Sequence, residues 1–350
     1  MNRSSIPRIE TIAAVLPSAV VTSDQILEQL NVPEKPKLTE VTGIRERRVA
    51  AEGTTTIDLA TQAARRAVDG STYLASEIDL IIVCSITRFI EPGVVQYAPS
   101  LASVVRREIG AADALAFDVS NACAGMATGL VIATQMIKTG AVTKALIVSG
   151  EHITTISETA VREISKKYDP QFAALTVGDS SCALVLDGEG SEKERIEAAA
   201  VMTAAEAAAL CVGMPSDQSR GVAMYTDNKR MHSERRYTQG WEFVKRGLTS
   251  LGTDMKHAGY DFLVHHQFSM VANEYLRHLG ENSIFETALP PELNVMQSYG
   301  NTSSTAIFVV LHEYLRNGTI KPGNRVLVVP SASGMVHGFI SVRLGEGVAA

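Results

Sequence analysis

A single cysteine, Cys123, lies where a thiol could act as a nucleophile. It follows the strand-like run 115–119 and precedes a helix start made of small residues, 124–129. The N-terminal dipole of such a helix favours the thiolate, and small neighbours let a substrate approach the sulfur. We therefore expect Cys123 to accept an acyl group from a thioester. The alternative, a buried and inert thiol, is our interpretation of the other cysteines, Cys84, Cys182 and Cys211.

Two further candidates lie in the second half of the chain. His265 and His266 follow the apolar run 262–264, at the end of a predicted strand where sites in α/β sheets form. Because side chains alternate along a strand, one of the two must point away from such a site. Asn301 lies in a Tyr-Gly-Asn-Thr-Ser run, which is typical of a turn that caps a helix. Taken alone, the histidine and the asparagine are each more typical of a structural role.

The elements that must position these residues alternate between strand and helix, which predicts an α/β fold. Continuous apolar runs, typical of strands covered on both faces, occur at 80–83, 145–148, 182–186, 262–264, 326–329 and 339–342. Helices are predicted at 56–68, 125–139 and 306–315. An early strand and turn are expected in 11–21, around Pro17. The segment 204–236 has a poor pattern and is interpreted as an insertion or mobile loop.

The order strand, candidate residue, helix and strand occurs twice. In the first half Asp79 precedes a strand, and Cys123 and a second strand follow. In the second half Asp261 and Asn301 hold the corresponding places at similar spacing. We therefore predict two copies of one α/β unit, 1–190 carrying the nucleophilic cysteine and 191–350 carrying the histidine and asparagine.

Composition excludes several classes of protein. The 350 residues carry a formal net charge of -6, so the chain has no overall attraction for nucleic acid. The four cysteines show no CxxC spacing, so we expect neither a disulfide framework nor a metal site. No run of eighteen apolar residues and no signal peptide are found, so we expect no membrane span and a cytoplasmic location.

Five motifs, in order along nearly the whole chain, carry a resemblance to a known family. They are Thr42-Gly43-Ile44-Arg45-Glu46-Arg47, Phe117-Asp118-Val119-Ser120-Asn121-Ala122-Cys123-Ala124-Gly125, Val177-Gly178-Asp179, His266-Gln267 and Tyr299-Gly300-Asn301-Thr302-Ser303. With them the sequence resembles the β-ketoacyl-acyl-carrier-protein synthase III branch of the thiolase-like condensing enzymes. The resemblance implies a duplicated thiolase-like fold, a five-layered α/β/α/β/α sandwich, and a homodimer. It also implies a Cys–His–Asn site, with His266 as the histidine because the family's histidine precedes glutamine.

The resemblance also implies a mechanism without a metal or redox cofactor. Cys123 takes an acyl group from a coenzyme A or acyl-carrier-protein thioester. His266 and Asn301 then bind the carbonyl of a malonyl-type thioester, and the enolate formed on loss of carbon dioxide attacks the acyl-cysteine. The backbone N–H groups of Cys123 and Ser333 form the oxyanion hole.

Several positions depart from the housekeeping members of that family. Lys37 stands where they have tryptophan, Val41 and Val271 stand where they have arginine, and Phe268 stands where they have alanine. These changes favour a specialised fatty-acid-like or polyketide pathway with a carrier protein as donor. Ala98, expected to reach across the dimer, replaces a frequent phenylalanine at the end of the acyl pocket. With Ala98, Met126 and Phe268 as substrate-binding residues, we expect a longer or branched acyl donor.

Two other reactions are open at this stage. One passes the acyl group from Cys123 to an alcohol or amine; relatives that do so often lose the asparagine, which is present here. The other joins two acyl thioesters head to head without decarboxylation. It needs a partner-subunit glutamate in the loop before Pro99, where this chain has Gln96-Tyr97-Ala98 and Glu91 is the nearest acid. A binding module without activity would not require Cys123, His266 and Asn301 together.

Overall fold

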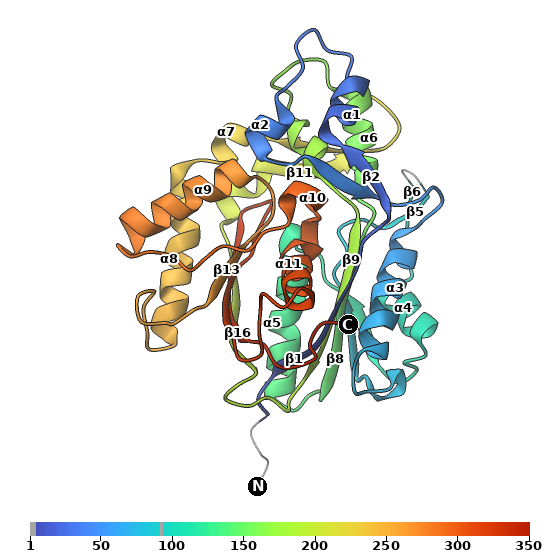
Figure 1. Ribbon diagram of the computed structural model, residues 1–350. Coiled ribbons are helices and arrows are strands. Elements are labelled where there is room, and N and C mark those ends of the chain that lie inside the picture. The colour runs from blue at the N-terminus through green and yellow to red at the C-terminus, as the bar shows by residue number, and fades with distance from the viewer. Residues whose placement is uncertain (1–4, 92–93) are drawn as a thin grey trace.

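A computed structural model describes residues 5–91 and 94–350, and its core consists of two mixed β-sheets (Figure 1). The first sheet has the strand order β1 (Arg8–Val15), β9 (Ser180–Asp187), β8 (Lys144–Glu151), β4 (Leu80–Val83), β7 (Leu115–Asp118). The second has the order β10 (Arg195–Thr203), β16 (Val336–Arg343), β14 (Arg325–Val329), β13 (Phe262–His265), with β15 (Ser331–Ala332) paired to β16. The six predicted strands and the early strand before Pro17 are confirmed.

Helices form the other three layers. Between the sheets lie α5 (Gly125–Lys138) and α11 (Ala306–Arg316). Outside the first sheet lie α3 (Thr56–Asp69) and α4 (Leu101–Ile109), and outside the second lie α8 (Glu234–Ser250) and α9 (Met270–Leu279). The two central helices are buried on most faces because a sheet covers each side, and they form one core with both sheets. The expected five-layered sandwich is confirmed.

The two sheets repeat the same construction. In each, a long antiparallel pair (β1 with β9, β10 with β16) has a bulge near the start of its first strand. In each, a parallel pair (β4 with β8, β13 with β14) follows towards the opposite edge. All strands of the first sheet precede residue 190 and all strands of the second follow it. The change from one sheet to the other thus falls near residue 190, and the division into 1–190 and 191–350 stays a prediction.

Shorter elements form a cap at one end of the sandwich, at the top of Figure 1. They include β2 (Ala19–Thr22), α1 (Ser23–Gln29), α2 (Leu38–Thr42), β3 (Glu46–Val49), α6 (Thr154–Glu163), β11 (Cys211–Pro215), β12 (Val222–Thr226), α7 (Asn228–Met231) and α10 (Met296–Tyr299). Strands β5 (Phe89–Glu91) and β6 (Val94–Val95) form a separate hairpin. In the part of the chain that the structure describes, no helix is both long and apolar enough to cross a membrane.

The interpretation of 204–236 as a loop was wrong, while its interpretation as an insertion stays a prediction. The segment contains the β11–β12 hairpin, α7 and the start of α8. Val222 and Met224 of the hairpin pack against the cap's hydrophobic core, whereas most residues of β11 are exposed. Because only one strand of the hairpin faces a core, the segment lacks a clear hydrophobic period.

Candidate functional site

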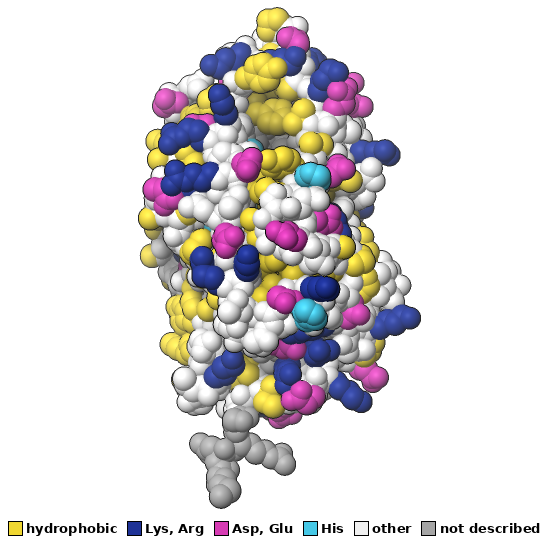
Figure 2. All heavy atoms as spheres, turned by 90° about the vertical axis from the view of Figure 1, so that its left-hand side faces the viewer, with side chains coloured by type: hydrophobic (Ala, Val, Ile, Leu, Met, Phe, Trp, Pro, Cys, Tyr) yellow, Lys and Arg dark blue, Asp and Glu magenta, His cyan; other side chains and the backbone are white. Residues whose placement is uncertain are grey.

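A cavity of about 1390 Å³ lies between the cap and the two sheets. Its wall includes Cys123, His266, Asn301 and Ser333, which come from both halves of the chain. Most of the remaining wall is apolar, with side chains such as Ile153, Ile156, Phe172, Met224 and Phe268. Figure 2 shows a hollow with hydrophobic side chains near the top of the face that carries α7 and α9.

Cys123 lies in a short 3₁₀ turn, Ala122–Ala124, that leads into α5. Ala122 has φ 45°, a left-handed conformation that turns the chain sharply before the helix. The Oγ of Ser303 donates a hydrogen bond to the Cys123 Sγ at 3.6 Å, and the backbone N–H of Ser333 also faces this sulfur. The thiol of the first half is thus surrounded by donors of the second half.

The resting thiol is not the thiolate that the helix position suggested. Burial raises the pKa of Cys123 to about 12, and the negative charge of nearby Glu151 acts in the same direction. The hydrogen bonds from Ser303 and Ser333 lower the pKa but do not outweigh burial. Cys123 is therefore a neutral thiol at pH 7.

His266 follows directly after β13 and lines the cavity. Burial lowers its pKa to about 4, so the imidazole is neutral at pH 7 and can either donate or accept a proton. The side chain of His265 lies elsewhere, against Trp241 at 5.1 Å between ring centroids, with its Nδ1 3.4 Å from Glu292. The alternation of side chains along the strand thus separates the two neighbours, and His266 is the one at the cavity.

The side chain of Asn301 both caps the next turn and faces the cavity. Its Oδ1 accepts a hydrogen bond from the backbone N–H of Ser303 at 2.9 Å. Because the amide oxygen and nitrogen point in different directions from the same carbon, this hydrogen bond turns Nδ2 away from the Ser303 backbone. The structural interpretation of Asn301 and the functional one are therefore compatible.

Two glycines allow the motif around Gly178 to approach the motif around Asn301 closely. A Cβ on Gly178 would lie 2.2 Å from the carbonyl oxygen of Tyr299, and one on Gly300 would lie 2.7 Å from that of Thr176. Gly300 also has φ 66°. Hydrogen bonds from Asn301 N–H to the Thr176 carbonyl and from Gly178 N–H to the Asn301 carbonyl, at 2.9 and 3.0 Å, join the two segments.

The first motif completes this support. Arg47 is fully buried beneath both glycines, and its guanidinium donates to the Leu175 carbonyl at 3.0 Å and to Ser23 Oγ at 3.2 Å. Burial lowers the pKa of Arg47 to about 10, which still leaves it charged at pH 7. Arg47 therefore stabilises the backbone that holds Asn301.

The turn at Ser333 lies beside two thiols. Its backbone N–H faces Cys123, while its Oγ donates to the Sγ of Cys211 at 3.1 Å. Cys211 lines the cavity and is only partly buried, so our interpretation of it as a buried thiol was wrong, while its inertness stays a prediction. Cys84 and Cys182 are buried in the core, as expected. Cys211 belongs to the weakly patterned segment, and nothing in the sequence signals that it comes close to Cys123.

The three predicted pocket residues have different positions. Phe268 lines the cavity and stacks on His266, with 5.9 Å between ring centroids. Met126 instead packs inside the central core and does not reach the cavity wall, which contradicts its assignment. Ala98 is exposed and lies outside this chain's own cavity, so its role depends on a second subunit.

The positions that differ from the housekeeping members, Lys37, Val41 and Val271, all line the cavity. Both valines are about half exposed, which places them at its mouth.

Sequence reasoning also missed a second imidazole, His232, which lines the cavity together with Tyr237. No group of three or more His, Cys, Asp or Glu side chains that could hold a metal occurs in residues 5–91 and 94–350.

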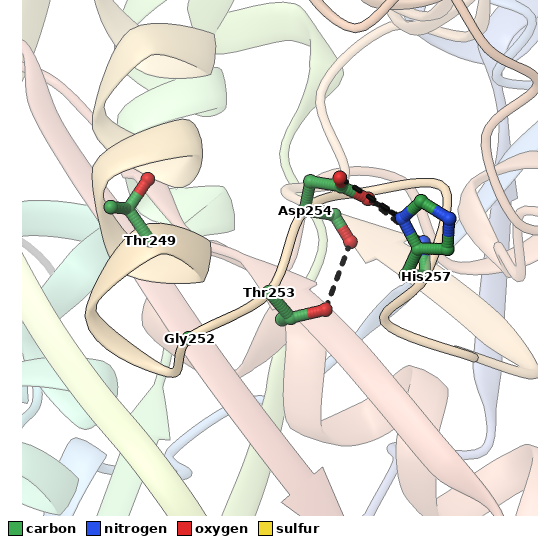
Figure 3. Close-up of a pocket in the computed structure, with 5 residues that line it drawn as sticks. All are labelled: Thr249, Gly252, Thr253, Asp254 and His257. Carbon is green, nitrogen blue, oxygen red and sulfur yellow. Dashed lines mark hydrogen bonds and ion pairs between the residues drawn. The ribbon is translucent and has the colours of Figure 1, made fainter.

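A second depression, of about 450 Å³, lies near the end of α8 (Figure 3). It is lined by Thr249, Gly252, Thr253, Asp254 and His257. The His257 Nδ1 is 2.8 Å from Asp254 Oδ1, and both side chains are largely exposed, 70% and 65%. An exposed pair of this kind is weakly held and encloses no substrate, so the large cavity is the candidate site.

Comparison with known proteins gives consistent results for both halves. Residues 117–205 match the family described as 3-Oxoacyl-[acyl-carrier-protein (ACP)] synthase III, and residues 253–344 match its C-terminal counterpart. The chain is 29% identical over 346 residues to a beta-ketoacyl-[acyl-carrier-protein] synthase III of Paramagnetospirillum magneticum, covering 94% of this chain and 96% of that one. It is 28% identical to synthase III 1 of Bacillus cereus, covering 96% and 98%.

Solved structures show the same fold. The 3-oxoacyl-[acyl-carrier-protein] synthase III of Aquifex aeolicus superimposes with a TM-score of 0.79 at 23% identity, covering 96% of this chain and 99% of that one. A variant of Xanthomonas campestris OleA superimposes with a TM-score of 0.83 at 24% identity, covering 97% and 99%.

Proposed function

This chain belongs to the 3-oxoacyl-[acyl-carrier-protein] synthase III family of acyl-thioester condensing enzymes, and from that premise we propose a decarboxylative condensation in two steps. An acyl group is first loaded on Cys123. It is then joined to a malonyl-type thioester with loss of carbon dioxide. The observation that carries this proposal is the convergence of Cys123, His266, Asn301 and Ser333 on one largely apolar cavity.

In the first step the sulfur of Cys123 attacks the carbonyl carbon of the acyl thioester. Its proton passes to the neutral imidazole of His266 and then to the departing thiolate, so that the carrier leaves as a free thiol. The low pKa of His266 supports this role, because an imidazole that is already protonated could not take the proton. The high pKa of Cys123 has the complementary consequence: an empty site holds an unreactive thiol.

In the second step the malonyl-type thioester places its carbonyl oxygen at the N–H groups of His266 and Asn301. As the bond to the carboxylate breaks, carbon dioxide leaves and its electron pair becomes an enolate that these donors stabilise. The enolate carbon attacks the acyl carbon on Cys123, and the N–H groups of Cys123 and Ser333 bind the resulting oxyanion. Collapse of that intermediate releases the 3-oxoacyl thioester and expels the Cys123 thiolate, which takes up one proton from water to restore the thiol. The hydrogen bond from the Ser303 N–H to Asn301 Oδ1 supports this role, because it holds the Nδ2 donor in place before the substrate arrives.

The substrates follow from the cavity and its mouth. The apolar wall suits a hydrocarbon chain, and Lys37, Lys167 and Lys229 line the same cavity, where they could meet the phosphate of a carrier's arm. We propose a carrier-protein or coenzyme A thioester as donor and a homodimer as the active form.

The test uses the wild-type protein and intact-mass measurement. After incubation with a series of acyl thioesters, the protein should gain the mass of one acyl group. Addition of a malonyl thioester should then release carbon dioxide and a 3-oxoacyl product. Acylated protein that reacts only with an alcohol or amine would replace this proposal with simple acyl transfer. A product formed from two acyl thioesters without malonyl would replace it with head-to-head condensation.

A further inference from the structure

The cavity contains a row of three aromatic rings that links the catalytic histidine to a second one. Phe268 stacks on His266 at 5.9 Å between centroids, and it also stacks on His232 at 5.4 Å with the ring planes 7° apart. His232 ends the short helix α7 and is exposed, so it lies where the cavity meets solvent. The row thus runs from the reacting centre towards the mouth.

The hydroxyl of Tyr237 fixes the protonation of His232. The Nδ1 of His232 lies 2.9 Å from Tyr237 Oη, and this is the only partner of that hydroxyl among the described residues. Burial raises the pKa of Tyr237 to about 12, so the phenol keeps its proton and donates it to Nδ1. One face of the ring is covered by Phe268, and burial lowers the pKa of His232, so the imidazole is neutral at pH 7 and its own proton is on Nε2.

The second nitrogen is open to a ligand. Nε2 has no hydrogen-bond partner in residues 5–91 and 94–350, and the side chain that carries it is exposed and lines the cavity. A neutral N–H is a donor only, so the partner that it suits is an acceptor oxygen such as an amide carbonyl.

We propose that His232 is a substrate-binding residue whose Nε2–H donates a hydrogen bond to an amide carbonyl of the arm that joins the thioester to its carrier. This inference rests on the proposed function, because it needs a thioester at Cys123. The arm must leave the cavity through the mouth, since a carrier is too large to enter it. Phe268 separates His232 from His266, so His232 acts on binding and not on the reacting bond.

The experiment compares thioesters of one acyl group on three thiols: pantetheine, N-acetylcysteamine and ethanethiol. The ethanethiol ester lacks the amide. His232→Phe keeps an aromatic ring against Phe268 but removes the N–H. It should raise KM about five- to tenfold for the pantetheine thioester, leave kcat unchanged, and leave KM for the ethanethiol thioester unchanged. The N-acetylcysteamine thioester then indicates which amide is bound.

A second variant keeps the inference testable if His232→Phe folds poorly. Tyr237→Phe retains the ring but loses the hydroxyl that sets the tautomer, and it should raise the same KM by a smaller factor. An equal rise of KM for all three thiols, or no rise for any, would overturn the assignment. Failure of the wild type to gain an acyl group on Cys123 would instead contradict the proposed function.

Discussion

The turn that carries Cys123 and the turn that follows Asn301 are built alike but present different chemistry. Each contains a residue with positive φ, Ala122 at 45° and Ser303 at 61°, and each leads through a 3₁₀ turn into a central helix. In the first turn the reactive thiol lies within the 3₁₀ turn itself. In the second the asparagine precedes the turn and is held by capping it. The fold thus directs two helix starts at one cavity, and one start presents a thiol while the other presents a side-chain amide.

Burial shifts the pKa values of Cys123 and His266 in opposite directions, but both shifts favour the neutral form. It raises the pKa of Cys123 and lowers that of His266, so both groups are neutral near pH 7. A neutral pair avoids the cost of unpaired charge in an apolar cavity. We therefore expect the Cys123 thiol to become reactive only when a substrate is bound, and not in the empty site.

The largest effect is expected from removing the thiol. Cys123→Ala should gain no acyl group, because no other cysteine has the same donors around its sulfur. Peptide mapping of the acylated wild type should find the adduct on Cys123 alone among the four cysteines. An adduct on Cys211 would show that the neighbouring thiol, and not Cys123, is the nucleophile.

The second effect separates the two turns. His266→Ala and Asn301→Ala should still accept an acyl group, the histidine variant more slowly because it lacks the proton acceptor. Both should form product roughly 100-fold more slowly, because each loses a donor to the enolate. Asn301→Asp is the matched control, since its carboxylate still accepts the Ser303 N–H but donates nothing. The aspartate variant should retain about 1 kcal/mol of stability that the alanine variant loses with the cap, yet be equally slow. Normal product formation by Asn301→Ala would exclude decarboxylative chemistry.

The third effect concerns pH and stability. The pKa of His266 in the folded chain is about 4, below the value of about 6.5 expected in an unfolded chain. As pH falls, the unfolded chain therefore takes up the proton first, and stability is lost progressively between about pH 6.5 and about pH 4. One such group should cost about 2 kcal/mol between pH 7 and pH 5. Urea unfolding of wild type and His266→Gln at both pH values measures this, and an equal pH dependence in the two proteins would contradict it.

The smallest effect is expected at Ala98. If this residue reaches the partner's acyl pocket, Ala98→Phe should reject long acyl donors and keep short ones. Each buried methylene contributes about 0.8 kcal/mol, so the preference should change by a factor of several per carbon. A series of acyl thioesters of increasing length on both proteins tests this, and an unchanged length profile would remove Ala98 from the pocket.

The strands, the central helices and the layer order could be predicted because apolar runs and small-residue helix starts are local features. The motifs around Cys123, His266 and Asn301 could be recognised for the same reason, and these residues do share one cavity; their roles stay predictions. The position of Met126 could not be predicted, because α5 is buried on most faces and its sequence does not indicate which face meets the cavity. The pKa of Cys123 depends on burial by distant segments, which outweighs the local helix dipole. Cys211 and His232 reach the cavity because a hairpin and a short helix pack against distant parts of the chain, and the local sequence does not indicate this packing.

The bonds that hold the backbone of Asn301 have a consequence for how the chain folds. The carbonyl of Thr176 and the N–H of Gly178 come from one half, while Asn301 comes from the other. The central helices also share a single core with both sheets. Neither half can therefore assemble the site before the other half has folded. Local opening of the first half would remove the hydrogen bonds that hold the Asn301 backbone in the second. We expect the chain to unfold in one cooperative transition, without a populated state in which only one half is folded.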